Sequence, residues 1–101
     1  MLTAGQQLRQ VRLARKLTVR MVARMSRELA HQHRNDEFYL TPSRLSEIER
    51  RDATPSIYKL YSLAAIYGIP YVSVLQLYGI DLTQIEADLL LLQTKSASAG
   101  R

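Results

Sequence analysis

The sequence contains no cysteine and no tryptophan, and phenylalanine occurs only once. Without cysteine the chain can form neither a disulfide nor a thiolate metal site, and it has no thiol nucleophile. Its two histidines, His31 and His33, point apart at i and i+2 on a helix, and no third ligand lies nearby in the sequence to complete a metal site. We therefore expect no metal and no other cofactor.

Long apolar runs and glycine-rich segments are also absent. The longest apolar runs fall far short of the roughly 20 residues that a membrane-spanning helix needs, and no signal peptide precedes the first helical pattern. There is no glycine-rich phosphate loop, and no pair of acids is placed to converge with a histidine. The sequence thus predicts a cytoplasmic protein with no enzymatic activity and no membrane partner.

Acidic residues are scarce in the first half of the chain. Residues 1–51 carry eleven Lys and Arg against five Asp and Glu, whereas residues 52–101 carry three against four. A basic half suits a polyanionic partner such as nucleic acid. Arginine is also common on solvated helix surfaces, so charge alone leaves both interpretations open.

Apolar residues make up 47% of the chain, enough for one small core, and they recur with helical spacing and no convincing period-two alternation. Capping residues and prolines predict the helix starts: Thr3 with Gln6 as a capping box, Thr18, Thr41 followed by Pro42, the segment from Thr54 to Ser56, Pro70 and Asp81. A turn is expected at Asp52. The predicted fold is all-α, with one domain over residues 3–79, a C-terminal helix over residues 80–93 and a flexible tail over residues 94–101.

Most of the predicted helices have a stripe of residues expected to face the core. The members are Ala4, Leu8 and Val11 in the first helix; Val22, Met25, Ser26, Leu29 and Ala30 in the second; Ile57, Leu60, Leu63, Ala64 and Tyr67 in the fourth; and Tyr71, Val74 and Leu75 in the fifth. Arg20, Arg24 and Arg27 occupy the outer side of the second helix. Residues 31–37 are polar and predict a helix end and a loop, whereas residues 38–40 form an apolar run expected to pack against the core.

The helix predicted over residues 41–51 is the most informative segment. Leu45, Ile48 and Glu49 share its inner face at i, i+3 and i+4. Its outer face carries short polar groups, one guanidinium and one carboxylate, on Pro42, Ser43, Arg44, Ser46 and Glu47. Such a face suits the reading of base edges in a DNA groove, although any capped amphipathic helix has a similar pattern.

Five segments, taken in order, resemble the XRE (Cro and lambda-repressor-like) helix-turn-helix DNA-binding family. They are Leu-Arg-Gln-Val-Arg at residues 8–12, Leu-Thr at 17–18, Val-Ala at 22–23, Leu-Ser-Glu-Ile-Glu-Arg at 45–50, and the stretch from Pro55 through Leu63-Ala64 to Gly68-Ile69. The resemblance spans about residues 5–78. It implies a compact five-helix domain in which the helix over residues 41–51 lies in the major groove of double-stranded DNA.

The resemblance also implies roles for individual residues. Ser43, Arg44, Ser46 and Glu47 take the positions that contact base edges, while Thr18, Arg20 and Thr41 take positions near phosphates. Arg12 and Glu49 resemble the family's internal ion pair, which fixes the recognition helix to the scaffold; the alternative is two exposed charges on separate helices. Arg50 and Arg51 are expected to contact phosphates because residues at the edge of a groove meet the backbone first.

Three features depart from the family pattern. The connection between the second and third helices is much longer than the family's tight turn, so the angle between these helices cannot be inferred from the resemblance. Val19 stands where the family often has a phosphate-binding Gln. Arg51 stands where a Gly usually follows the third helix, and a left-handed turn there would cost a non-glycine residue roughly 1 kcal/mol.

Tyrosine supplies most of the aromatic area, at Tyr58, Tyr61, Tyr67, Tyr71 and Tyr78 among others. Aromatic side chains can form a stacking platform for single-stranded nucleic acid. Because Tyr67 and Tyr71 fall on stripes expected to face the core, packing is the favoured interpretation.

The C-terminal helix has an apolar seam at Leu82, Ile85, Leu89 and Leu92, spaced 3, 4 and 3 as in helices that pack together. Leu90 and Leu91 widen this seam to nearly a whole turn. The favoured interpretation is a homodimer that uses this seam. The alternative is a helix that folds back over Tyr71, Val74 and Tyr78.

The leading hypothesis is sequence-specific binding of double-stranded DNA by a bacterial or phage transcriptional regulator. The alternative is a protein-interaction module, or an antitoxin-like protein, that uses the same fold and binds a protein partner through residues 31–40. Binding to random duplex DNA at two salt concentrations discriminates between them, since phosphate contacts require a steep salt dependence.

Overall fold

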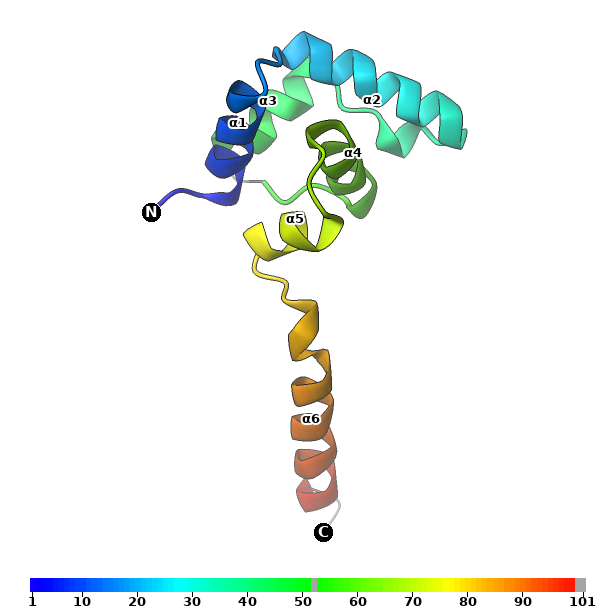
Figure 1. The fold of residues 1–101 in the computed structure, drawn as a ribbon. Coiled ribbons are helices and arrows are strands. Elements are labelled where there is room, and N and C mark those ends of the chain that lie inside the picture. The colour runs from blue at the N-terminus through cyan, green and yellow to red at the C-terminus, as the bar shows by residue number, and fades with distance from the viewer. Residues whose placement is uncertain (52, 100–101) are drawn as a thin grey trace.

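Helices account for all of the regular secondary structure in the described residues, and no strand is present among them (Figure 1). The computed structural model describes residues 1–51 and 53–99, the last three by their backbone. In chain order the elements are α1 (Ala4–Ala14), α2 (Val19–His33), the 3-10 helix η1 (Asp36–Phe38), α3 (Pro42–Arg51), α4 (Ile57–Tyr67), α5 (Tyr71–Leu77), the 3-10 helix η2 (Leu82–Gln84) and α6 (Ile85–Ala99). The all-α prediction is confirmed. The turn expected at Asp52, and residues 100–101 of the expected tail, lie outside the described residues.

Side-chain caps start three of the helices at the predicted residues. The Thr3 N–H donates to Gln6 Oε1 at 2.9 Å, and the Gln6 N–H donates to Thr3 Oγ1 at 3.1 Å, which completes the capping box. Thr18 Oγ1 accepts the Met21 N–H at 3.1 Å, and Thr41 Oγ1 accepts the Arg44 N–H at 3.0 Å. Each cap satisfies a backbone donor that has no partner within its own helix.

The start of α4 differs from the prediction. The helix begins at Ile57, and its cap is Ser56, whose Oγ accepts the Lys59 N–H at 3.3 Å. Residues 53–56 have no regular secondary structure and Pro55 is buried, so the segment from Thr54 to Ser56 does not form a first helical turn. Ile57 then stands at the first helical position and is 63% exposed, which corrects its assignment to the core.

One core assignment, one helix end and one expected turn also differ from the prediction. Met25 is 39% exposed rather than buried, because α2 faces the core with the smaller side chains Val22, Ala23, Ser26 and Ala30. At the C-terminus, α6 continues to Ala99, past Gln93, where the predicted helix ended. Arg51 is the last residue of α3 and does not have a positive φ, so the left-handed turn considered for it does not occur.

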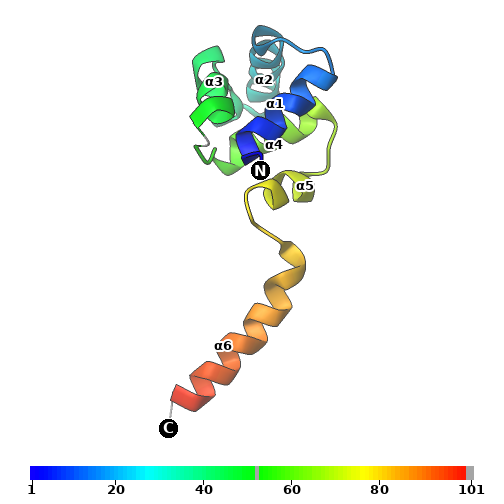
Figure 2. The ribbon, with the colours of Figure 1, turned by 90° about the vertical axis from the view of Figure 1, so that its left-hand side faces the viewer.

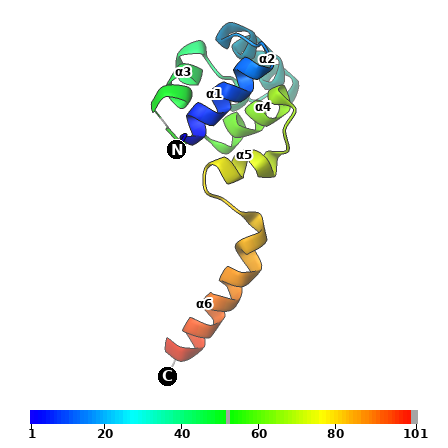
Figure 3. The same cartoon turned by 60° about the vertical axis from the view of Figure 1, so that its left-hand side comes forward.

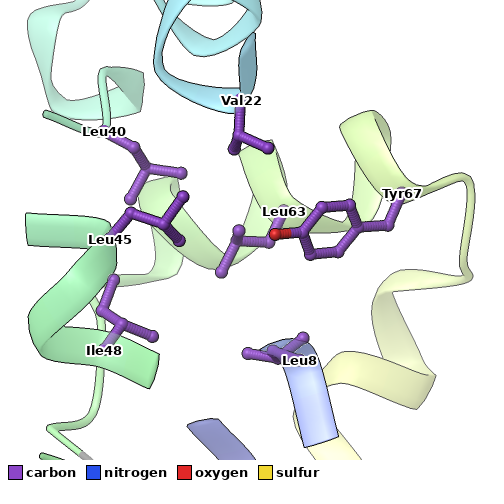
Figure 4. Close-up of a cluster of buried hydrophobic side chains, with 7 residues drawn as sticks. All are labelled: Leu8, Val22, Leu40, Leu45, Ile48, Leu63 and Tyr67. Carbon is purple, nitrogen blue, oxygen red and sulfur yellow. The ribbon is translucent and has the colours of Figure 1, made fainter. Parts of the chain in front are cut away.

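The core lies where α1, α2, α3 and α4 meet. Figure 4 shows its fully buried side chains pointing toward one another from these four helices and from the segment after η1; they are Leu8, Val22, Leu40, Leu45, Ile48, Leu63 and Tyr67. A second cluster, formed by Leu60, Ala64 and Val74, joins α5 to α4. As a result, α3 is held on its inner face by apolar contacts with three other helices.

The long connection between α2 and α3 is anchored at several points. Leu40 is fully buried, as expected, and its N–H donates to Ser26 Oγ at 2.8 Å, while Ser26 Oγ donates to the Ala23 carbonyl at 2.7 Å. Ser62 Oγ in α4 donates to the Phe38 carbonyl at 2.6 Å. The connection therefore packs on both α2 and α4, and its hydrogen bonds fix the position at which α3 begins.

Beyond α5 the chain leaves the domain, and α6 projects away from it in all three views (Figures 1, 2 and 3). The molecule is 57 Å long in its longest dimension, and every side chain from Leu82 to Ser96 is exposed. The fold-back arrangement over Tyr71, Val74 and Tyr78 is therefore not the one observed.

No single described helix is both long enough and apolar enough to cross a bilayer. The pair α4 and α5 meets the criteria only when taken together, and it is bent by 119° at the break.

Candidate nucleic-acid interface

The outer face of α3 gathers the residues that the sequence singled out for base contacts. Ser43 and Glu47 are exposed, and Arg44 and Ser46 are partly exposed. An open hollow of about 400 Å³ is lined by Pro42, Ser43, Ser46, Glu47, Arg50 and Arg51. The structure thus brings together on one helix face three of the four base-edge candidates and both of the C-terminal phosphate candidates.

Two of these residues already contact each other. Arg44 Nη1 lies 3.1 Å from Glu47 Oε2, an i, i+3 ion pair with both side chains partly exposed. Exposed ion pairs contribute at most about 1 kcal/mol, so a ligand group that accepts from the guanidinium can replace Glu47. The pair therefore orients Arg44 along the outer face without excluding a contact to a base edge.

Three residues at the starts of α2 and α3 were predicted to lie near phosphates, and two of them already make hydrogen bonds within the chain. The hydroxyls of Thr18 and Thr41 both cap their own helices by accepting a backbone N–H. Arg20 is exposed and lines a second hollow of about 290 Å³ between α2 and the start of α3. Pro42 lines both hollows, so the surface of α2 that carries Arg20 adjoins the outer face of α3.

The second hollow contains residues that were not assigned to the site from the sequence. Besides Arg20, Ala23 and Pro42 it is lined by Arg24, Arg27 and Tyr39. The three arginines are spaced i, i+4 and i+7, which places them on one face of α2. This spacing was visible in the sequence, but only the structure shows that Tyr39, from the long connection, joins the same surface.

Behind the interface, Arg12 of α1 and Glu49 of α3 form the predicted ion pair. Arg12 Nε lies 2.7 Å from Glu49 Oε2, and Arg12 Nη2 lies 2.9 Å from Glu49 Oε1, which makes the pair bidentate. Arg12 Nη1 also donates to the Leu17 carbonyl at 2.9 Å. Only 7% of Arg12 and 4% of Glu49 are exposed, so the interaction is shielded from water.

The hydrogen bond with Glu49 raises the pKa of Arg12 above its ordinary value, although burial acts in the opposite direction. The guanidinium of Arg12 therefore stays charged. Tyr67 packs nearby in the core, and burial raises the pKa of its phenol. The Tyr67 hydroxyl has no hydrogen-bond partner among the described residues.

Not every basic residue of the first half is free to bind a polyanion. Arg12 is paired with Glu49, and Arg15 donates from Nε to the Tyr67 carbonyl at the C-terminal end of α4. These two arginines stabilise the scaffold, and the second is favourably placed against the helix dipole. Exposed positive charge remains on α2 and at the C-terminal end of α3, and also on Arg9, Lys16 and Arg34.

A cluster of aromatic rings lies at the other end of α2. Phe38 stacks on His33 with ring centroids 4.4 Å apart, and it contacts Tyr58 at 5.3 Å and Tyr61 at 5.4 Å edge-to-face. Tyr67, by contrast, is buried in the core and cannot stack on a base. In the part of the chain that the structure describes, no group of three or more His, Cys, Asp or Glu is placed to hold a metal ion.

Comparison of the chain with protein-family models, with curated proteins and with solved structures finds no match in any of the three.

Proposed function

We propose that the chain binds double-stranded DNA in a sequence-dependent manner, with the outer face of α3 in the major groove, and that it acts as a bacterial or phage transcriptional regulator. The observation that carries this proposal is the arrangement of α3. Its outer face presents Ser43, Arg44, Ser46 and Glu47 beside Arg50 and Arg51, while its inner face is locked to α1 by a buried bidentate ion pair. An α-helix with side chains is ~10–12 Å across, which matches the width of the major groove.

In this arrangement the positions of the side chains separate base contacts from phosphate contacts. Arg44 can donate two hydrogen bonds to a guanine edge, and the hydroxyls of Ser43 and Ser46 can donate or accept. Arg50 and Arg51 lie at the C-terminal end of α3, both exposed, where they meet the sugar–phosphate backbone. Base contacts specify the sequence, and phosphate contacts supply most of the salt-dependent affinity.

Substitution of the α3 arginines distinguishes these roles. Arg44→Ala should weaken binding to the selected sequence by about 1–3 kcal/mol and relax the preference at one base position. Arg50→Ala and Arg51→Ala should weaken binding to all sequences alike, and each should flatten the slope of log K against log[salt] by about one. Selection from a random duplex pool, followed by anisotropy titrations at several salt concentrations, measures both effects.

Lys95→Ala removes a positive charge from α6, far from this surface, and serves as the control for net charge. An Arg44→Ala variant that keeps both the selected motif and the affinity would show that α3 does not enter the groove as proposed.

We further propose that two copies associate through α6. Leu82, Ile85, Leu89 and Leu92 are all at least 43% exposed, and so are Leu90 and Leu91. Four consecutive leucines at residues 89–92 surround one turn of the helix at 100° per residue, and an exposed turn that is apolar on all sides favours a partner. A second copy supplies one, and it would also present a second α3 to the next half-site on the DNA.

Removal of α6 tests this association. A chain that ends at Gly79 should be monomeric and bind its operator much more weakly, but its melting temperature should barely change because α6 packs against nothing in the domain. In the full chain, Leu89→Glu should likewise give a monomer, measured by sedimentation at micromolar concentration. It should also weaken operator binding. A full-length chain that is already monomeric there would contradict the dimer.

A second function, binding of a protein partner through residues 31–40, is favoured by one observation. The rings of His33, Phe38, Tyr58 and Tyr61 form an aromatic cluster in which both tyrosines are more than a third exposed. Exposed aromatic residues are typical of protein interfaces. Absence of duplex binding at low salt would favour this function over DNA binding.

A further inference from the structure

We propose that the face of α2 formed by Arg20, Arg24 and Arg27 is a second phosphate-binding surface, which holds the backbone of one DNA strand beside the groove that α3 enters. This inference rests on the proposed function, and it extends the footprint from the start of α2 to its third turn. It assigns a role to Arg24, Arg27 and Tyr39, which are not part of the α3 face.

The placement is continuous with the α3 face. Arg20, Arg24 and Arg27 line one open hollow together with Pro42, and Pro42 also lines the hollow along α3. From Arg20 to Arg27 the helix rises by ~10 Å, which spans about three of the ~3.4 Å axial steps between phosphates of one strand. A strand that passes along this face therefore places phosphates within reach of all three arginine side chains.

No ion pair compensates the charge of this face among the described residues, although Asp36 lines an adjoining hollow together with Arg27 and Tyr39. The hollow that the three arginines line has no acidic residue in its lining, and among the described residues neither Arg20 nor Arg24 has a hydrogen-bond or ion-pair partner. Glu28, the one acid of α2, lies in a different hollow on the side that faces α4. Three like charges within three turns repel one another, and a polyanion that binds along them removes this repulsion.

Tyr39 orients the last arginine of the face. Arg27 Nη2 donates to the Tyr39 hydroxyl at 2.9 Å, and the guanidinium carbon lies 4.9 Å from the centre of the Tyr39 ring. A guanidinium has five N–H donors, so the remaining ones can still bind a phosphate while the stacked ring limits its orientation. Tyr39 is itself held in place because the next residue, Leu40, is buried and hydrogen-bonded to Ser26.

The long connection between α2 and α3 thereby has a function in DNA binding. It lets α2 extend to His33, which adds the turns that carry Arg24 and Arg27, and it returns Tyr39 to the surface of those turns. Tyr39 is a positioning residue in this scheme, since it acts on DNA only through Arg27.

The test measures the salt dependence of binding to a random-sequence duplex by the full-length chain. Arg24→Gln and Arg27→Gln should each reduce the slope of log K against log[salt] by ~0.9. Between 50 and 200 mM salt each variant should then lose ~3-fold less affinity than the unmodified chain, with the selected motif unchanged. Lys95→Gln on α6 removes the same charge elsewhere and should leave the slope unchanged.

Tyr39 gives a second readout that a merely structural role would not change. Tyr39→Leu should reduce the slope as Arg27→Gln does, and Tyr39→Phe, which keeps the ring, should restore most of it. Circular dichroism melting of each variant verifies that the fold is retained. A slope that is insensitive to Tyr39→Leu in a folded variant would overturn the role of this residue.

The outcomes separate the two proposals. If the unmodified chain binds duplex DNA and Arg44→Ala relaxes one base position, but the Arg24→Gln, Arg27→Gln double variant keeps the full slope, then the α2 face holds no phosphate and only this inference fails. If the unmodified chain does not bind duplex DNA at 50 mM salt, both proposals fail. A reduced slope with an unchanged motif supports the inference.

Discussion

Replacing Glu49 with alanine is expected to lower the free energy of unfolding by about 3–5 kcal/mol. The substitution removes both hydrogen bonds that Arg12 makes to the carboxylate, at 2.7 and 2.9 Å, and leaves only the bond to the Leu17 carbonyl. Arg12 stays buried, and its charge is then uncompensated. Because the pair joins α1 to α3, the variant should also lose DNA affinity by freeing the helix that carries the outer face. Urea titration followed by circular dichroism measures the stability.

A matched double variant shows whether the loss comes from the unpaired charge, and Tyr67→Phe is a control in the same core. An Arg12→Met, Glu49→Met double variant removes both charges, and it should recover most of the stability because apolar replacements of buried ion pairs are often neutral or stabilising. Tyr67→Phe removes a hydroxyl that has no partner among the described residues and should be neutral or slightly stabilising. A loss below about 1 kcal/mol for Glu49→Ala would place the pair in water instead of the core.

Gly5→Ala is expected to destabilise the domain by at least about 3 kcal/mol, at the upper end of the losses caused by overpacking. A Cβ at Gly5 would overlap the Ile48 carbonyl oxygen and would lie 3.2 Å from Glu49 Cα. These are backbone atoms of α3, so no side-chain rotation relieves the contact, and the two helices must separate. On helix propensity alone the same substitution would stabilise α1 by up to about 1 kcal/mol, so the two effects have opposite signs.

Thermal melting shows whether overpacking or helix propensity has the larger effect on the stability of Gly5→Ala. Gln10→Ala, at an exposed position of the same helix, is the control and should have a small effect. The Gly5→Ala variant should also weaken DNA binding, because a displaced α3 separates Glu49 from Arg12. A higher melting temperature for Gly5→Ala would mean that α1 and α3 do not cross as closely as described.

Much of the local structure could be predicted from the sequence because the interactions that define it are short-range. The caps at Thr3, Thr18 and Thr41 each involve a backbone group three residues away. The inner face of α3 follows from helical periodicity, and so does the polar outer face that makes it a candidate for DNA binding. The burial of Leu40 was predicted because it follows a polar segment and ends a short apolar run.

Other predictions from the sequence were wrong or incomplete. The Thr-Pro-Ser motif at residues 41–43 and its copy at 54–56 have the same local preferences, yet only the first begins a helix with Thr as its cap. In the second copy Pro55 is buried and Ser56 is the cap. The contact of Gly5 with α3 has no signal in the sequence, because it depends on how closely two distant helices cross.

Local sequence was enough to predict the helical class, most of the helix starts and the composition of each helix face, since residues within about four positions of one another decide these properties. Which charges remain free depends on contacts between distant segments. Arg12 and Arg15 bind groups 37 and 52 residues away, whereas Arg20 and Arg24 have no partner among the described residues. The direction in which α6 leaves the domain likewise depends on the tertiary structure. These outcomes depend on crossing angles and packing depth, which are set by contacts between distant segments and not by periodicity along the chain.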